Sequence, residues 1–199
     1  MIGIVLAGFL AASFNACSTR PDTRSRVLVS VAEQRLLLIQ DDQPKDVFRV
    51  STSKFGLGDK PGSCATPLGR FQVARKIGDG ARPGAVFKNR RPTGEVLRPN
   101  APGRDPIVSR IIWLRGLEAQ NGNAYKRFIY IHGTVEERNL GEAVSYGCIR
   151  MGSRDVIALY NQIGVGAEVT IMSGPLDRKS TRLNSSHESP SRIPSSSLK

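Results

Sequence analysis

The stretch from Ile129 to Met151 constrains this chain most, because it sets a histidine and a cysteine beside glycines. Phe128 to Ile131 is a short β-prone run, and such a run bounded by turn residues predicts a buried strand. His132 then lies at the end of that strand, where the backbone fixes the imidazole, and Gly133 allows a substrate to approach closely. Cys148 also follows a glycine.

His132 and Cys148 form a candidate base and nucleophile. A thiol attacks as its thiolate, and a nearby imidazole can take its proton. Their spacing leaves two plainer interpretations open, a cysteine that packs as a small hydrophobe and a hydrogen-bonded core histidine. A zinc site built from Cys64, Cys148 and His132 is disfavoured, because the sequence has no paired-ligand spacing such as C-x-x-C.

Two longer strings favour the catalytic interpretation. The string 132–134, followed by 145–151, resembles the active-site signature of the L,D-transpeptidases, the YkuD-domain family. A second string at 66–71 is similar to another hallmark of that family, and it stands in the same order relative to the cysteine. The letters are His132-Gly133-Thr134, Ser145-Tyr146-Gly147-Cys148-Ile149-Arg150-Met151 and Thr66-Pro67-Leu68-Gly69-Arg70-Phe71.

The resemblance implies a role for each residue of the signature. Cys148 is expected to be the acylated nucleophile and His132 its general base, with the backbone carbonyl of Gly133 orienting the imidazole ring. The backbone N–H groups of Gly147 and Cys148 are expected to stabilise the tetrahedral intermediate. No cofactor and no metal are implied.

The resemblance also implies substrate-binding positions at Ser145, Tyr146 and Arg150. Arg150 is expected either to face the substrate or to brace the loop by binding nearby carbonyl groups. Most members of the family have histidine where this chain has Tyr146. Because that histidine is not the expected base, we expect activity to survive with altered substrate contacts.

The chain is expected to have four segments. Residues 1–17 form an export signal, either of the lipoprotein type with a lipid on Cys17 or an ordinary cleaved signal, since the run Ile2 to Ala12 is too short to span a bilayer. Residues 18–25 form a linker and 26–175 a YkuD-like catalytic domain. The tail at 176–199 has eight serines and no aromatics, which predicts disorder, and it resembles a non-native extension.

Alternating and short apolar runs predict a mainly β domain, and the resemblance implies a YkuD-like two-sheet sandwich with one or two short helices. Ser153 is expected to cap the helix and Gly164 to end it. Trp113 is expected in the core. The expected elements are a hairpin of Arg26–Val31 and Arg35–Gln40, strands at Val47–Ser51, Phe71–Arg75, Ile107–Leu117 and Val169–Met172, and a helix at Arg154–Gln162.

The segment from Gly78 to Pro106 contains five glycines, five prolines and six Lys/Arg. A loop of this length is usually functional or disordered, and we interpret it as a basic flap over the active site. The chain carries a net charge of +12. A positively charged surface suits the carboxylates of peptidoglycan stem peptides. A basic surface that is only solvated is equally consistent with this charge.

Taken together, the residues predict acyl transfer through a thioester, and the resemblance supplies the substrate. A peptidoglycan stem tetrapeptide would lose D-alanine and pass its acyl group to an amine of another stem peptide. The alternatives are a carboxypeptidase or hydrolase of the same chemistry, attachment of an envelope protein, or a non-catalytic wall-binding module. We expect a monomer in the cell envelope or periplasm, bound to membrane only through a lipid on Cys17, with no nucleic-acid partner.

Overall fold

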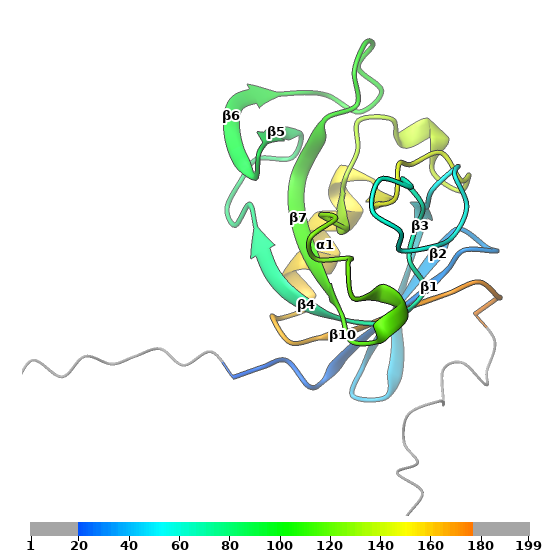
Figure 1. Ribbon diagram of the computed structural model, residues 1–199. Coiled ribbons are helices and arrows are strands. Elements are labelled where there is room, and N and C mark those ends of the chain that lie inside the picture. Colours follow the sequence, from blue (N-terminus) through cyan, green and yellow to red (C-terminus); the bar gives the residue numbers. More distant parts are fainter. Residues whose placement is uncertain (1–19, 177–199) are drawn as a thin grey trace, which may run out of the picture.

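The computed structural model describes residues 20–176, so the expected export signal and nearly all of the tail lie outside the described residues. Within this range the chain forms ten strands and one α-helix, α1 (Ser153–Gln162) (Figure 1). Two single 3₁₀ turns are η1 (Ala119–Asn121) and η2 (Glu137–Asn139). The strands are β1 (Ser25–Ser30), β2 (Arg35–Gln40), β3 (Gln43–Ser51), β4 (Gly69–Ile77), β5 (Ala85–Lys88), β6 (Arg91–Val96), β7 (Ile107–Gly116), β8 (Tyr130–Gly133), β9 (Ile149–Met151) and β10 (Glu168–Met172).

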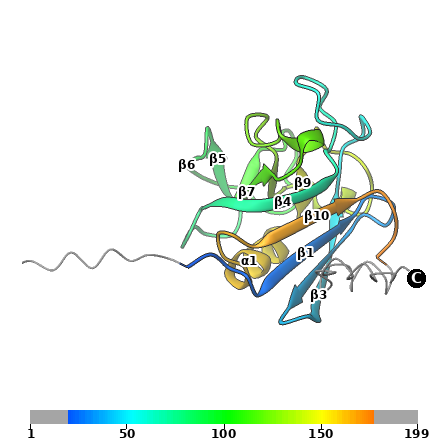
Figure 2. The same cartoon turned by 60° about the horizontal axis from the view of Figure 1, so that its bottom comes forward.

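The ten strands form one sheet in the order β4-β10-β1-β2-β3-β9-β8-β7-β5-β6, and β4 also pairs with β7. This last pairing closes eight strands into a barrel, whose β4, β10 and β1 lie side by side in Figure 2. The mainly β fold with one short helix is confirmed. The two expected sheets are opposite walls of one closed sheet, because β4 pairs with strands at both of its edges.

The β1–β2 hairpin shows how the sequence builds this wall. The predicted hairpin is present, and its register runs from Ser25 opposite Gln40 to Ser30 opposite Arg35. Side chains of a strand alternate between faces, so Val27 and Val29 point into the barrel core while Leu28 points away. Leu28 is buried nevertheless, since it packs with apolar residues of β2 on the other face. The hairpin is therefore apolar on both faces.

The helix α1 packs against β7 and β8 and supplies Val156, Leu159 and Tyr160 to the main core. Its N-cap is Gly152, so the expected cap by Ser153 is wrong. Ser153 is the first helical residue, and its backbone N–H donates to the Glu137 carboxylate at 2.8 Å, which replaces a side-chain cap. No helix within residues 20–176 has the length and apolar character needed to cross a membrane.

The described end of the expected linker is packed against the domain. Asp22 accepts hydrogen bonds from the backbone N–H groups of Gly164 at 2.7 Å and of Arg24 and Ser25 at 3.0 Å. The helix ends at Gln162, just before Gly164. Asp22 thus joins the start of β1 to the end of α1, and the packed chain begins before Arg26.

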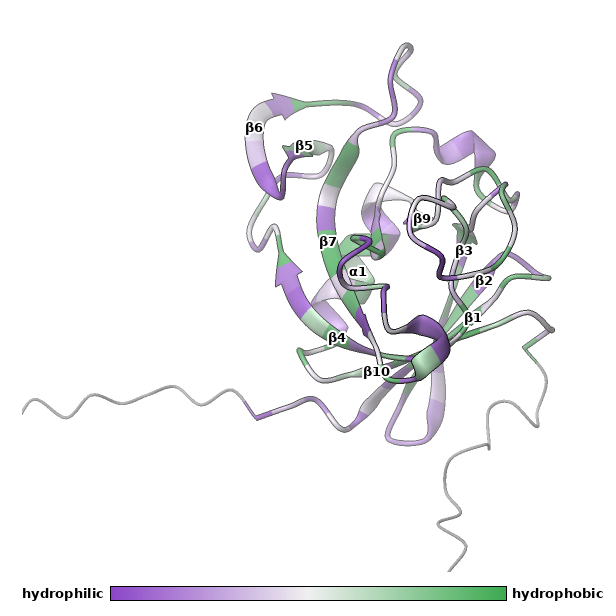
Figure 3. Cartoon of the chain, in the orientation of Figure 1, coloured by the Kyte–Doolittle hydropathy of each residue, from purple (hydrophilic) through white to green (hydrophobic). Residues whose placement is uncertain are grey.

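The segment from Gly78 to Pro106 is not a continuous loop, because it contains the β5–β6 hairpin. Phe87 of β5 is buried and pairs with Ile107 of β7, which attaches the hairpin to the edge of the barrel. Asn89 and Arg90 form its turn with φ values of 51° and 66°. β6 is exposed along its whole length and coloured hydrophilic in Figure 3, whereas β7 is largely hydrophobic. An exposed strand of this kind leaves no apolar pattern in the sequence.

Gly133 in β8 allows the close approach of β7, and this suggests a first test. A Cβ at this position would lie 2.5 Å from the backbone oxygen of Val108. We expect Gly133→Ala to lower the free energy of unfolding by about 1–3 kcal/mol, the usual effect of overpacking, as measured by urea denaturation. Gly174→Ala is the matched control, because no heavy atom lies within 4 Å of its added Cβ. Equal midpoints for the two variants would contradict this packing argument.

Candidate active site

The pairing of two neighbouring parallel strands places His132 and Cys148, the residue just before β9, on the same face of the sheet. β8 pairs with β9 so that Ile131 lies opposite Ile149 and His132 opposite Arg150. Ile131 and Ile149 are fully buried in the barrel core. Because side chains alternate along a strand, His132, Arg150 and Cys148 lie on the other face. The fold therefore brings the two candidate catalytic residues together on one face, although they are 16 positions apart in the chain.

The imidazole of His132 is fixed in one orientation. Its Nδ1 lies 2.8 Å from the carbonyl oxygen of Gly133, the contact that the sequence predicts. A carbonyl only accepts, so Nδ1 carries the proton and Nε2 keeps a free lone pair. Burial lowers the pKa of His132 to about 4, the Gly133 carbonyl opposes this shift, and the charge of Arg150 adds to it. At neutral pH the ring is uncharged and able to accept a proton.

The thiol of Cys148 is half-buried beside aromatic side chains. Its Sγ lies 3.4 Å from the carbonyl oxygen of Phe128 and packs against Tyr130. Burial raises the pKa of Cys148 to about 11, against smaller opposite effects from the Tyr130 backbone and from the charges of Arg150 and Arg127. The resting pair is thus a neutral thiol and a neutral imidazole. A nucleophilic thiolate has to form as the thiol proton leaves.

The backbone around Cys148 is held by hydroxyl groups. Ser145 Oγ donates to the Cys148 carbonyl at 2.6 Å and accepts from the Gly147 N–H at 3.2 Å. Thr66 Oγ1, from the second family-like string at 66–71, donates to the Gly147 carbonyl at 3.0 Å. Ser145 is fully buried, and through these two bonds it braces the turn; its expected role in binding substrate stays a prediction. The Gly147 N–H, expected at the oxyanion site, is occupied by Ser145 in this state.

Gly147 itself is required by the close approach of a second loop. Its φ is 115°, and an added Cβ would lie 3.1 Å from the backbone oxygen of Ala65. Cys64, next in that loop, is half-buried, and its carbonyl accepts a hydrogen bond from Ser53 Oγ at 2.6 Å. No cluster of three or more His, Cys, Asp or Glu side chains in residues 20–176 is arranged to hold a metal ion. The loop of Cys64 supports the turn of Cys148 through its backbone.

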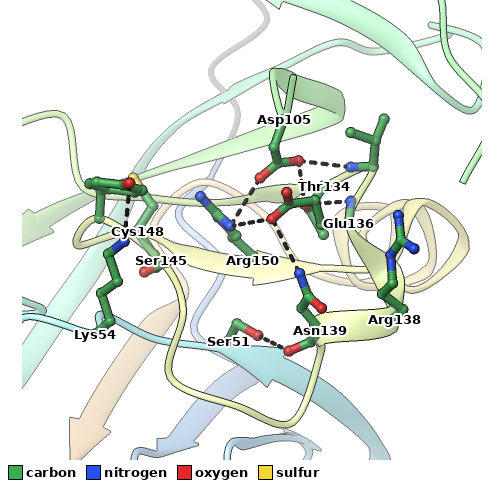
Figure 4. Close-up of polar contacts among 12 residues, drawn as sticks. Ser51, Lys54, Asp105, Thr134, Glu136, Arg138, Asn139, Ser145, Cys148 and Arg150 are labelled. Atoms are coloured by element: carbon green, nitrogen blue, oxygen red, sulfur yellow. Dashed lines mark hydrogen bonds and ion pairs between the residues drawn. The ribbon is translucent and has the colours of Figure 1, made fainter. Parts of the chain in front are cut away.

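Arg150 is held by two carboxylates, as Figure 4 shows. Its Nη1 lies 3.0 Å from Asp105 Oδ2, an ion pair without hydrogen-bond geometry, and 3.3 Å from Glu136 Oε2. Asp105 is itself fixed, because its Oδ1 accepts from Thr134 Oγ1 at 2.5 Å and from the Val135 N–H at 3.0 Å. Only 11% of the Arg150 side chain is exposed. Of the two expected roles for Arg150, the structure favours bracing.

Tyr146 is the exposed residue of the signature, with 58% of its surface accessible. Lys54 Nζ donates to the Tyr146 hydroxyl at 3.2 Å and lies 4.5 Å from the centre of its ring. A cavity of about 510 Å³ opens here. Sequence patterns do not point to Lys54 or Asp105, because each is a single charged residue in a loop far from the signature. The cavity is lined by Lys54, Asp105, Glu136, Val144, Tyr146 and Arg150.

The closed β domain, with His132 in β8 and Cys148 just before the adjacent strand β9, defines a class of cysteine-dependent acyl-transfer proteins. Residues 24–171 match the family model of the YkuD L,D-transpeptidase catalytic domain, and the chain belongs to this family. Members of the family are cysteine-dependent enzymes that act on the peptidoglycan stem peptides of the cell wall.

Two curated relatives agree with this assignment. The chain is 31% identical over 145 residues to YqjB of Bacillus subtilis strain 168. This matched region covers 73% of this chain and 69% of the relative. It is 28% identical over 158 residues to the L,D-transpeptidase relative ErfK/SrfK of Escherichia coli K12, covering 78% of this chain and 47% of the relative. The chain therefore spans about half the length of the Escherichia coli protein.

Solved structures show the same fold at low identity. An L,D-transpeptidase from Mycobacterium tuberculosis H37Rv superposes with a TM-score of 0.50 at 17% identity, covering 75% of this chain and 58% of that one. L,D-transpeptidase 3 from Mycobacterium tuberculosis, solved in complex with a faropenem-derived adduct, gives a TM-score of 0.50 at 18% identity, with 75% and 60% covered. These likenesses establish the YkuD-like fold.

The raised pKa of Cys148 predicts a particular pH profile for alkylation. Only the thiolate reacts with iodoacetamide, so a thiol with a pKa of about 11 should react faster with each step in pH from 7 to 10. A preformed thiolate–imidazolium pair would instead give a rate that is already level near neutral pH. Peptide mapping separates the Cys148 peptide from the Cys64 peptide in the same sample. A level profile for Cys148 between pH 7 and 9 would contradict the neutral pair.

Proposed function

We propose that this chain is an L,D-transpeptidase of peptidoglycan. It releases D-alanine from a stem tetrapeptide, holds the remaining acyl group as a thioester on Cys148, and transfers that group to an amine. The observation that carries this proposal is that the pairing of β8 with β9 puts Cys148 and His132 on the same face of the sheet, with the His132 ring neutral and oriented by the Gly133 carbonyl. The cell envelope is the location that this substrate implies.

Acylation follows from the resting protonation states. As Sγ of Cys148 attacks the carbonyl carbon, the thiol proton passes to Nε2 of His132 and the C–S bond forms. The imidazolium is a stronger acid than that of an exposed histidine, because burial lowers its pKa to about 4. It therefore passes the proton readily to the leaving nitrogen, the C–N bond breaks, and D-alanine departs.

The oxyanion of the intermediate needs donors beside Cys148. One candidate donor is the backbone N–H of Cys148, the residue that carries the nucleophilic sulfur. The other is the backbone N–H of Gly147, the residue before it. At present Gly147 donates to Ser145 Oγ at 3.2 Å, a long contact. We propose that Gly147 exchanges this partner for the oxyanion, while Ser145 keeps its 2.6 Å bond to the Cys148 carbonyl.

The nucleophile and base are tested by substitution. Cys148→Ala should abolish both D-alanine release from a stem tetrapeptide and covalent labelling by faropenem, whereas Cys64→Ala should retain both. His132→Ala should lower the rate of thioester formation by roughly 10²- to 10⁴-fold, as expected for loss of a general base. Intact-mass analysis follows the thioester, and circular dichroism verifies folding. Labelling that disappears with Cys64 would overturn the assignment.

The choice between transfer and hydrolysis depends on access of water to the thioester. The β5–β6 hairpin covers the aromatic side of the thiol: Arg90 Cζ lies 4.9 Å from the ring centre of Phe128 and 5.3 Å from that of Trp113. Its Nη1 also lies 3.5 Å from the hydroxyl of Tyr130, against which Cys148 packs. Exclusion of water from this side favours transfer, and we propose that the hairpin acts as a lid.

The lid is tested by product ratios. With donor and acceptor stem peptides together, cross-linked dimers should exceed hydrolysed tripeptides. Arg90→Ala removes the contact at the hairpin tip and should shift the products several-fold toward tripeptide, with a smaller loss of D-alanine release. Arg91→Ala, an exposed neighbour in the same hairpin, is the control. Shortening the whole segment is unsuitable, because Phe87 is buried.

Two outcomes would separate the alternatives. If the intact enzyme yields only tripeptide at saturating acceptor, a peptidoglycan carboxypeptidase remains, since Cys148 and His132 serve both reactions. If Arg90→Ala leaves the product ratio unchanged, transfer stands and the role of the hairpin as a lid does not.

A further inference from the structure

The cavity beside Tyr146 is lined by neighbours of both candidate catalytic residues. Tyr146 and Val144 come from the turn before Cys148, and Arg150 is opposite His132 in the strand register. The other side of the thiol is occupied by the aromatic cluster of Tyr130. The cavity beside Tyr146 has a volume of about 510 Å³, which falls within the range of small-molecule sites, roughly 300–1,000 Å³.

Lys54 is an available positive charge in the wall of this cavity. Arg150 is neutralised by Asp105 and Glu136, and none of the ion pairs within residues 20–176 includes Lys54. Its ammonium group lies 4.5 Å from the ring centre of Tyr146 and 5.3 Å from that of Phe55. In Figure 4 Lys54 lies at the left, and Arg150 with its partners Asp105 and Glu136 lies to its right.

The position of Lys54 relative to the nucleophile is fixed by its backbone. Its N–H donates to the Ser145 carbonyl at 3.1 Å, and the Ser145 N–H donates to the Thr52 carbonyl at 2.8 Å. Ser145 in turn holds the Cys148 carbonyl. The contacts with two aromatic rings restrict the long side chain, which lowers the entropy cost of binding an anion.

The chemistry of the reaction indicates what this cavity holds. The leaving amine receives a proton from His132 and the incoming amine returns one to it, so both amines occupy the same side of the thioester. D-alanine leaves as an α-amino acid, with a carboxylate one carbon from its nitrogen. An amine bound near His132 therefore presents a carboxylate to the cavity wall, where Lys54 can bind it.

We propose that this cavity is the subsite for the amine component and that Lys54 binds its carboxylate. The inference rests on the proposed function and adds the ligand class, an amine with a neighbouring carboxylate. In the return reaction the amine nitrogen attacks the thioester carbon and the C–S bond breaks. The amine proton passes through His132 to the sulfur, and no further reactant is required.

The test is exchange of isotopically labelled D-alanine into an unlabelled stem tetrapeptide, followed by mass analysis. A parallel reaction uses D-alanine amide, which lacks the carboxylate charge. Lys54→Gln should lower incorporation of D-alanine by about ten-fold or more, as expected when a charge-assisted hydrogen bond is lost, and leave incorporation of D-alanine amide nearly unchanged. Lys54→Arg should restore most of the difference. Lys60→Gln, an exposed lysine of the same loop, should change neither rate.

Each rate is expressed relative to wild type, which cancels the unequal basicity of the two amines. Equal slowing of both probes by Lys54→Gln, or no slowing of either, would overturn the subsite. The same samples report the thioester by intact mass: thioester without carboxylate discrimination removes the subsite and keeps the proposed function, whereas no thioester removes both. If the enzyme only hydrolyses, Lys54→Gln must slow release of D-alanine more than release of D-alanine amide from the amidated tetrapeptide.

Discussion

The parallel pairing of β8 with β9 determines the rest of the active site. Both strands are internal to a closed sheet, since β9 lies between β3 and β8, and β8 lies between β9 and β7. Ile131 and Ile149 anchor the pair in the core, and their burial fixes the register. A slip of one residue would turn His132 toward the core. The catalytic geometry is thus secured by apolar packing on the face opposite to the chemistry.

Burial then sets the protonation states of the pair. Removal from water opposes charge on either partner, so it lowers the pKa of His132 and raises that of Cys148. The positive charge of Arg150 acts on both groups, since it disfavours the imidazolium and favours the thiolate. Asp105 holds Arg150 in that place and moderates its effect on His132. A buried ion pair therefore supports the site electrostatically, although neither member reaches the reacting atoms.

Sequence patterns predict the strands and the helix whose own residues carry a clear apolar pattern. The β1–β2 hairpin, β7 and α1 follow from runs of apolar residues, and the signature predicts Cys148 and His132 as the catalytic pair. Closure of the barrel could not be predicted, because the β4–β7 pairing joins segments more than thirty residues apart. The β5–β6 hairpin was hidden by Pro92 and Gly94 in an exposed strand. Asp105 and Lys54 are single charges whose importance depends on tertiary contacts alone.

Tyr146 stands where most family members have histidine, and it alters the surface of the cavity and not the surroundings of His132. Tyr146 is exposed, and its ring and hydroxyl both contact Lys54, whereas the base is held separately in β8 by the Gly133 carbonyl. The tyrosine ring carries no imidazole nitrogen. It can, however, hold a lysine ammonium over its face. The tyrosine thus puts in place of the usual histidine ring a platform that fixes a positive charge in the wall of the cavity.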